Sequence, residues 1–174
     1  MPHHGENAFR EKHPFVLAGT VTTAQTALAV TARDEDSVDA LAAAKTVIFE
    51  VPYGTPALDI RVRADGNDND TNVLDFYAKP ITAGGLDPEH YTRMFTLTGD
   101  RSTQIASTGI YFMDSFVISN NQWEAGYTVE NTTNEIDHLR VNTDGYEKIL
   151  VIVTALVSTT VYVDVKKLDR EVVA

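Results

Sequence analysis

The polar turn at residues 65–70, Asp-Gly-Asn-Asp-Asn-Asp, has enough oxygen ligands in one place for a hard metal ion such as calcium. It does not follow the EF-hand pattern, because Gly66 is second rather than sixth and Phe76 stands where that pattern needs a glutamate. The Asn and Asp side chains of such a turn can also bind their own backbone. We expect this structural role, with a calcium ion that braces the loop as the alternative.

The histidines do not follow a catalytic or metal-binding pattern. His3 and His4 could bind a divalent ion weakly, but we expect a solvated N-terminal tail there. His90 and His138 each follow a carboxylate directly, and neighbours in a strand face opposite ways, so these acids do not orient the imidazoles. Since the chain has no Gly-x-Ser-x-Gly elbow, we expect no catalytic triad. The 25 acids single out no pair for glycoside hydrolysis.

Three aromatic residues, Trp123, Tyr127 and Tyr111, could form a platform for a sugar ring. In a β-sandwich such side chains more often pack in the core or at an interface. No glycine-rich phosphate loop is present, and the formal charge of −11 repels phosphate backbones and anionic membrane surfaces. We therefore predict no catalytic residue, metal ligand or cofactor, and neither nucleic acid nor membrane as a partner.

The strands that flank the acidic turn indicate the fold. Residues 58–64 alternate apolar and charged side chains, which is the period of a half-buried strand. We expect the chain to reverse at the turn and to return as a second strand through Val73, Leu74, Phe76 and Tyr77. A polar outer face and an apolar inner face in such a unit require a second layer of strands.

Length and composition fit one folded domain. The chain has 174 residues, 43% of them hydrophobic and 22% charged, which is ordinary for a globular protein. It has no cysteine, so disulfides and thiolate sites are excluded. Its longest uninterrupted apolar run, residues 149–153, is far too short to cross a bilayer. We expect a flexible N-terminal arm at residues 1–14, without the features of a secretory signal, and a single β-sandwich domain at residues 15–174.

The rest of the chain is also strand-rich. We expect about nine or ten strands of an antiparallel β-sandwich, jelly-roll-like in type. The predicted strand segments are residues 15–21, 27–31, 46–51, 58–64, 73–78, 91–98, 110–119, 139–142, 146–155 and 159–168. Residues 123–130 could add an edge strand, and residues 104–106 a brief pairing. Acids at residues 34–36 ahead of an Ala-rich run that ends in Lys45 predict at most one short helix, near residues 37–45.

Three stretches together resemble the small virion structural proteins of tailed bacteriophages, of the auxiliary or decoration type that coats a capsid. They are residues 61–78, residues 110–123 and residues 145–164. The resemblance implies a β-sandwich or jelly roll that assembles in copies on a phage capsid and has no catalytic activity. It implies no role for any single residue.

On this basis the chain is expected to be a non-enzymatic virion protein that binds the major capsid protein or other virion proteins. Strand edges and the N-terminal arm, with Phe9, Phe15 and Val16 as apolar anchors, would make the contacts. A homo-oligomer, taken as a trimer, suits an icosahedral shell. The alternative is a calcium-braced, carbohydrate-binding β-sandwich module that uses Trp123, and a hydrolase with convergent acids is a second, more remote alternative.

Overall fold

The structure is a computed structural model, which describes residues 14–65, 71–81, 90–105, 110–119, 127–129, 139–143 and 145–168. Its strands are β1 (Val16–Val21), β2 (Thr46–Glu50), β3 (Ala57–Asp65), β4 (Asn72–Pro80), β5 (Thr92–Ile105), β6 (Ile110–Ser119), β7 (Tyr127–Val129), β8 (Leu139–Asn142), β9 (Tyr146–Ala155) and β10 (Val161–Leu168). The helical segments among these residues are the α-helix α2 (Glu35–Asp39) and the short 3-10 turns η1 (Val30–Ala32) and η2 (Ala43–Lys45).

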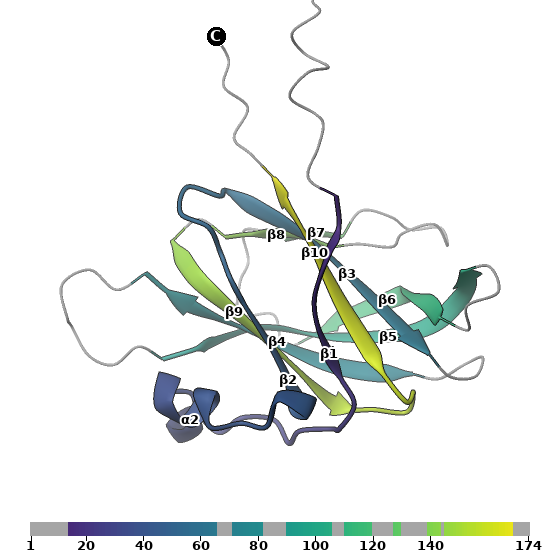
Figure 1. Cartoon of the computed structure of the whole chain (residues 1–174), viewed down its shortest axis with the longest axis horizontal. Helices are drawn as coiled ribbons and strands as arrows, with labels where there is room; N and C mark the ends of the chain where they lie inside the picture. The colour runs from purple at the N-terminus through teal and green to yellow at the C-terminus, as the bar shows by residue number, and fades with distance from the viewer. Residues whose placement is uncertain are drawn as a thin grey trace, which may run out of the picture.

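The strands form an all-β, antiparallel sandwich (Figure 1). The hydrogen-bonded order is β1-β10-β3-β6-β5-β4-β9-β2, so eight of the ten described strands form two layers of four strands each. The long pair β5–β6 carries this order from one layer to the other. The short strands β7 and β8 lie off this path, where β8 pairs with β3.

Alternating side chains of both layers fill the interior between them. In β3 and β10 the inward residues are aliphatic and almost fully buried, and in β4 and β9 they are aliphatic or aromatic. The rings of Phe76 and Phe95 stack at a centroid distance of 4.7 Å in this core. The alternation expected for residues 58–64 is therefore confirmed, since Leu58, Ile60 and Val62 are each at most 2% exposed.

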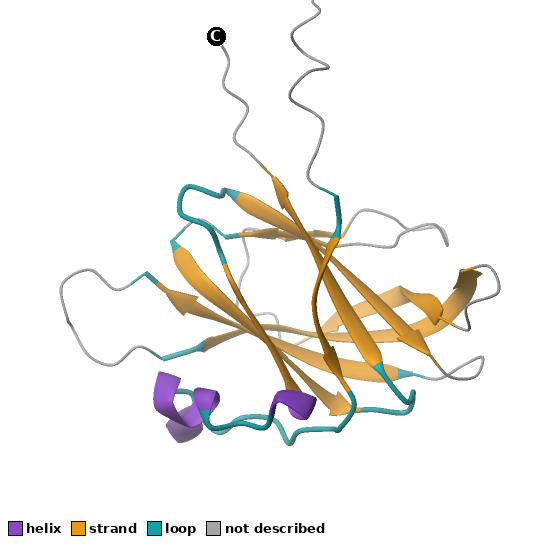
Figure 2. Cartoon of the chain, viewed as in Figure 1, coloured by secondary structure: helices purple, strands orange, loops and turns teal. Residues whose placement is uncertain are grey.

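A second, smaller core lies on the outer side of β4 and β9. It consists of Leu28, Val38, Tyr77, Tyr91, Leu150 and Ile152. The chain between β1 and β2, residues 22–45, carries η1, α2 and η2 across this face (Figure 2). One layer of the sandwich thus has an outer face covered by this segment, which we call the covering segment.

The helix differs from the sequence prediction in position. It begins at Glu35 and ends at Asp39, because Asp34 is extended and its carboxylate accepts a hydrogen bond from the backbone N–H of Ser37. The predicted range, residues 37–45, started too late and was too long, and its last part is the separate turn η2. The acids that were expected ahead of the helix are its N-cap and its first turn.

Two strand predictions were also wrong in extent. Residues 27–31 form no strand, because Leu28 turns into the second core and η1 follows it. Strand β5 does not end at residue 98 as predicted but continues to Ile105, and it includes the first two residues of the brief pairing that was expected at residues 104–106. Of the predicted strand at 123–130, the described part is β7.

The strands on either side of the acidic turn do not pair with each other. β3 hydrogen-bonds to β10, β6 and β8, whereas β4 hydrogen-bonds to β5 and β9. The returning strand is therefore in the opposite layer. Residues 66–70 lie outside the described residues.

Candidate interaction surfaces and polar networks

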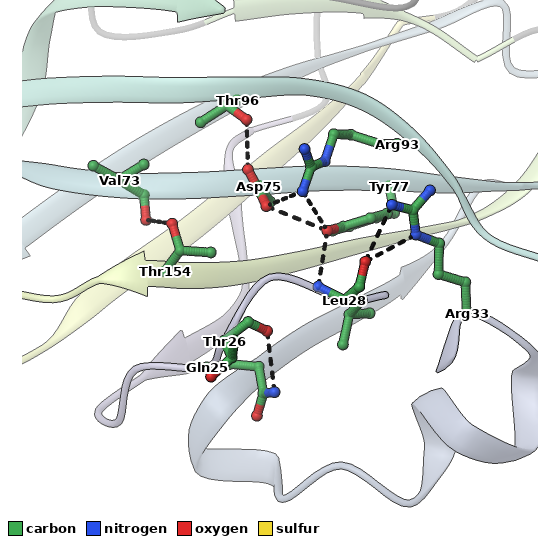
Figure 3. Close-up of polar contacts among 10 residues, drawn as sticks. All are labelled: Gln25, Thr26, Leu28, Arg33, Val73, Asp75, Tyr77, Arg93, Thr96 and Thr154. Carbon is green, nitrogen blue, oxygen red and sulfur yellow. Dashed lines mark hydrogen bonds and ion pairs between the residues drawn. The ribbon is translucent and has the colours of Figure 1, made fainter. Parts of the chain in front are cut away.

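Asp75 is the centre of a buried polar network on the outer side of β4 (Figure 3). The hydroxyl of Thr96 donates to one carboxylate oxygen at 2.5 Å, and Arg93 donates to the other at 2.9 Å. The Tyr77 hydroxyl also donates to this second oxygen, at 3.2 Å. Asp75 is only 3% exposed, so these donors offset the cost of burying its charge.

Tyr77 connects this network to the covering segment. Its hydroxyl oxygen accepts a hydrogen bond from the Leu28 backbone N–H at 3.3 Å and one from Arg93 at 3.2 Å. The Arg33 guanidinium lies 5.2 Å from the centre of the Tyr77 ring and donates to the Leu28 carbonyl oxygen. The hydrogen bond to Tyr77 raises the pKa of Arg93, with the nearby Asp75 adding to the effect. The Leu28 N–H is thus bonded to β4 directly, and its carbonyl oxygen is bonded to Arg33, which lies over the Tyr77 ring of β4.

Ion pairs hold α2 against the same layer. Lys79 is 2% exposed, and its Nζ lies 2.7 Å from a carboxylate oxygen of Glu35 and 2.7 Å from one of Glu147. Lys148 pairs with the other oxygen of Glu35, and this hydrogen bond raises the pKa of Lys148. Burial raises the pKa of the neighbouring Tyr91. Glu35 thereby anchors the first turn of α2 to β4 and β9.

The outer face of the other layer carries a group of charged side chains that we call the basic face. It comprises Leu17 on β1 and Phe15 just before it, Tyr162, Asp164 and Lys166 on β10, Asp59, Arg61, Arg63 and, at the strand end, Asp65 on β3, and Arg140 on β8. Residues that pair directly across antiparallel strands share a face, and the register pairs Leu17 with Asp164, Asp164 with Arg61, and Asp59 with Arg140.

Two acids of the basic face, Asp59 and Asp164, are buried beneath its arginines. Asp164 accepts hydrogen bonds from Arg61 at 2.9 Å and from Arg63 at 2.6 and 2.8 Å. Asp59 accepts from Arg140 at 2.9 Å. Their side chains are 3% exposed, while those of the three arginines are 20–39% exposed. The exposed groups of these ion pairs are therefore the guanidinium groups of Arg61, Arg63 and Arg140.

Aromatic rings complete the basic face. Arg61 lies 4.3 Å from the centre of the Phe15 ring, and the Lys166 ammonium lies 5.9 Å from it. Arg63 lies 5.1 Å from the ring centre of Tyr162. Cations over ring faces gain electrostatic energy from the ring electrons. Phe15, an anchor candidate from the sequence, is thus already packed beneath two cations.

The first residues of β1 expose apolar surface. Val16 is 58% exposed and Leu17 is 50% exposed, although they are adjacent and so point to opposite sides of the sheet. Further along β1 the strand approaches β2 closely, because a Cβ at Gly19 would lie 3.0 Å from Val47. The uncovered apolar surface is therefore confined to the start of the strand.

Of the acidic turn, the described residue is Asp65. Its carboxylate accepts a hydrogen bond from the Thr160 backbone N–H, and its own N–H donates to the Thr160 carbonyl at 3.1 Å. On the other side of the turn Asn72 accepts from the N–H groups of Val157 and Ser158 and donates to the Ser158 hydroxyl at 2.8 Å. Both flanks of the acidic turn therefore hold the β9–β10 connection.

The other candidates are described only in part. His90 forms an isolated bridge with Asp34, and its Nδ1 is buried without a hydrogen-bond partner in the described part of the chain. His3, His4, His138 and Trp123 lie outside the described residues, as does Phe9. Tyr111 and Tyr127 lie in β6 and β7, which are described at the level of the strand backbone. The proposed sugar platform therefore lies outside the described side chains.

The sequence indicated which residues of a strand share a polar face, but it did not indicate which residues pair across neighbouring strands. The polar sides of β3 and β10 could be read from alternation, but Arg61 and Asp164 are 103 positions apart. The burial of Lys79 gave no sequence signal, because lysines are mostly exposed.

Within the described ranges no three His, Cys, Asp or Glu side chains are placed to hold a metal ion. None of the helices described there has the length and apolar character needed to cross a membrane. The fold and these surfaces define an all-β sandwich whose buried charges pair with one another. Comparisons with protein-family models, curated proteins and solved structures gave no match for this chain.

Proposed function

We propose that this chain is a non-enzymatic structural protein of a phage particle, an auxiliary protein that decorates the outside of the capsid. In this proposal it has a jelly-roll-like sandwich, binds the major capsid protein or another virion protein, and assembles in copies, taken as three. Its location is the virion. The resemblance of residues 61–78, 110–123 and 145–164 to decoration proteins motivates the proposal, and the all-β sandwich is compatible with it.

The observation that carries the proposal is the apolar start of β1. Val16 is 58% exposed and Leu17 is 50% exposed. Both lie on β1, the strand at one end of the hydrogen-bonded order. An end strand with uncovered apolar side chains is suited to contact with another protein chain. The expected N-terminal arm, residues 1–14, leads directly into it. Ordering such an arm costs about 1–2 kcal/mol per residue, so a partner's contacts are needed to hold it.

The pairing of buried charges supports a structural role. The aspartates buried among the described residues, Asp59, Asp75 and Asp164, each accept hydrogen bonds from arginine. A carboxylate that is held this way stabilises cross-strand geometry, and removing its partner leaves a costly buried charge. The arrangement fits a rigid subunit of an assembly.

The test is binding to capsids that lack this protein, measured by co-sedimentation and by electron microscopy of the particles. We expect the full chain to bind and to appear as regular density on the capsid exterior. Deletion of residues 1–14 leaves the sandwich folded and weakens binding. The double variant Val16→Thr/Leu17→Thr weakens binding about tenfold or more, because burial of such side chains is worth about 1.5–3 kcal/mol each.

The matched control is Val157→Thr. Val157 is 59% exposed, like Val16, but it lies in the β9–β10 connection at the other end of β10. Its substitution leaves capsid binding unchanged. Equal binding by the deletion, the double variant and the full chain would refute the role of β1 and the arm. A sugar-dependent signal on a glycan array, present with calcium and lost with chelator, would instead support the carbohydrate-binding alternative.

A further inference from the structure

The two outer faces of the sandwich differ in charge. On the basic face the described side chains include four cations, Arg61, Arg63, Arg140 and Lys166, and three acids, Asp59, Asp164 and, at the end of β3, Asp65. The face lies opposite the covering segment, because its residues alternate with the main core in β3 and β10, whereas the segment packs outside β4 and β9. The basic face and the covering segment therefore lie on opposite outer faces of the sandwich.

The covering segment is acidic where it forms α2. Residues 34–39 contain four acids and no lysine or arginine. Asp34 caps the helix and Glu35 pairs with Lys79 and Lys148, but Asp36 and Asp39 are exposed. These two carboxylates are thus presented outward from the side of the molecule opposite the basic face.

The chain as a whole has a formal charge of −11, so a surface with an excess of cations is a local exception. The net charges of two copies repel each other, but α2 of a second copy offers the basic face exposed carboxylates at short range, where the local attraction acts. Complementary faces of this kind steer encounter and fix orientation.

We infer that the basic face binds the acidic α2 surface of a second copy of this chain. The inference rests on the proposed function, in which copies assemble on a shell. The contact joins different surfaces of the two copies, so it is heterologous, and repetition of such a contact closes a ring when the rotation between copies allows.

The experiment is sedimentation velocity on the full chain over a range of concentrations, at about 150 mM and about 500 mM salt. The Debye length is about 8 Å in the first condition, which screens much of the repulsion between the net charges of two copies, and about 4 Å in the second, where a contact between exposed charges weakens further. We expect self-association at the lower salt concentration and its loss at the higher one. A chain that stays monomeric at the lower salt concentration up to the highest protein concentration reached would overturn the inference.

Charge-reversal variants locate the contact. We expect Asp36→Lys/Asp39→Lys to weaken self-association about tenfold or more, and Lys166→Glu to do the same. A glutamate at 166 would stand opposite Asp59 in the register of β10 and β3. The α2 variant, in which both substituted residues are exposed, therefore tests the contact even where the Lys166 variant folds poorly.

A variant that combines Asp36→Lys/Asp39→Lys with Lys166→Glu distinguishes direct contact from a general charge effect. If the two surfaces meet, the loss of self-association affinity in this combined variant is about tenfold smaller than the product of the two separate losses. Lys45→Glu changes the charge as Lys166→Glu does, but outside the basic face, and we expect no weakening. Multiplicative losses, or an equal loss for Lys45→Glu, would overturn the inference.

The two proposals fail in different ways. If the chain binds capsids as a monomer, and the charge variants do not alter self-association, this inference is wrong and the proposed function stands. If salt-sensitive self-association is present without capsid binding, the proposed function is wrong and the contact stands. Loss of capsid binding in Lys166→Glu without any self-association would show an acidic partner in place of a second copy, and would also overturn the inference.

Discussion

At the scale of single residues, the buried aspartates Asp59, Asp75 and Asp164 form ion pairs that link neighbouring strands. Asp164 illustrates this, because it lies under two arginines of the adjacent strand and is 2% exposed. Alternation in the sequence places Asp164 and Arg61 on polar faces, but it cannot say that these faces adjoin. That follows from the antiparallel pairing of β10 with β3, which joins the last strand of the chain to an early one.

Replacing Asp164 by alanine is expected to destabilise the fold by about 2–3 kcal/mol. Removal of one partner of a buried ion pair costs about 3–5 kcal/mol, and the partial exposure of Arg61 and Arg63 reduces this. Urea unfolding measures the change. Asp164→Asn retains an oxygen that accepts a hydrogen bond, so it should lose less than the alanine variant. A cost below about 0.5 kcal/mol for alanine would show that the pairs contribute little.

Tyr77→Phe removes one oxygen that serves three hydrogen-bond partners. Without it the Leu28 N–H and part of the Arg93 guanidinium lose an acceptor, and we expect a loss of about 1–2 kcal/mol. Hydrogen exchange at the Leu28 amide should accelerate more than exchange in the main core. Tyr53→Phe is the matched control, because Tyr53 is 96% exposed. Unchanged exchange at Leu28 would contradict the proposed link between β4 and the covering segment.

At the scale of elements, α2 depends on its cap and on one glutamate. The helix has five residues, too few to be stable alone, so its position is set by Asp34 and by the pairing of Glu35 with Lys79 and Lys148. The sequence indicated a helix here through its acids, but it suggested that the Ala-rich run continued the helix. Ala40 is still helical and caps the C-terminus, and the extended backbone of Ala42 then separates α2 from η2.

Acid is expected to loosen α2 through Asp34. The hydrogen bonds from Ser37 lower the pKa of Asp34 from its model-compound value of 3.8. A lowered pKa in the folded state means that the carboxylate stabilises the helix start above pH 3.8, and that this contribution is lost as the pH falls through the lowered pKa. Chemical shifts of the Ser37 amide, followed from about pH 7 to about pH 2, should titrate with a midpoint below 3.8.

Asp34→Asn is the control for this titration. Asparagine keeps an oxygen for the Ser37 N–H but does not ionise, so its Ser37 amide shift should be flat over the same range. A midpoint at or above 3.8 in the parent chain would contradict the stabilisation of the carboxylate by the cap.

The strand elements could be predicted more fully than their arrangement. The segments at 110–119, 139–142 and 146–155 match β6, β8 and β9, because β-branched and aromatic runs between turn residues are a strong local signal. The pairing of β3 with β10, rather than with the strand that follows it, has no local signal. It arises because Leu58, Ile60 and Val62 on one layer must face Phe76 on the other.

At the scale of the whole molecule, the sandwich has two cores of unequal size on the two sides of β4 and β9. The main core joins residues from eight strands, whereas the second core joins six buried residues and holds the covering segment. Free energies of opening differ within a protein according to how much apolar contact each unit loses. The covering segment should therefore open at a lower free energy than the sandwich beneath it.

Paired substitutions in the two cores test this order. Val38 and Val62 are both 0% exposed, one in the second core and one in the main core. Truncation of such a buried valine to alanine costs about 2 kcal/mol, which is about a thirtyfold change in an opening equilibrium. In native-state hydrogen exchange, Val38→Ala should accelerate exchange in α2 and near Leu28 about thirtyfold and alter β3 and β10 much less. Val62→Ala should instead lower the opening free energy of the whole sandwich, with the covering segment following. Equal acceleration of both regions by Val38→Ala would mean that the segment and the sandwich unfold as one unit, and the α2 surface would then be as rigid as the basic face.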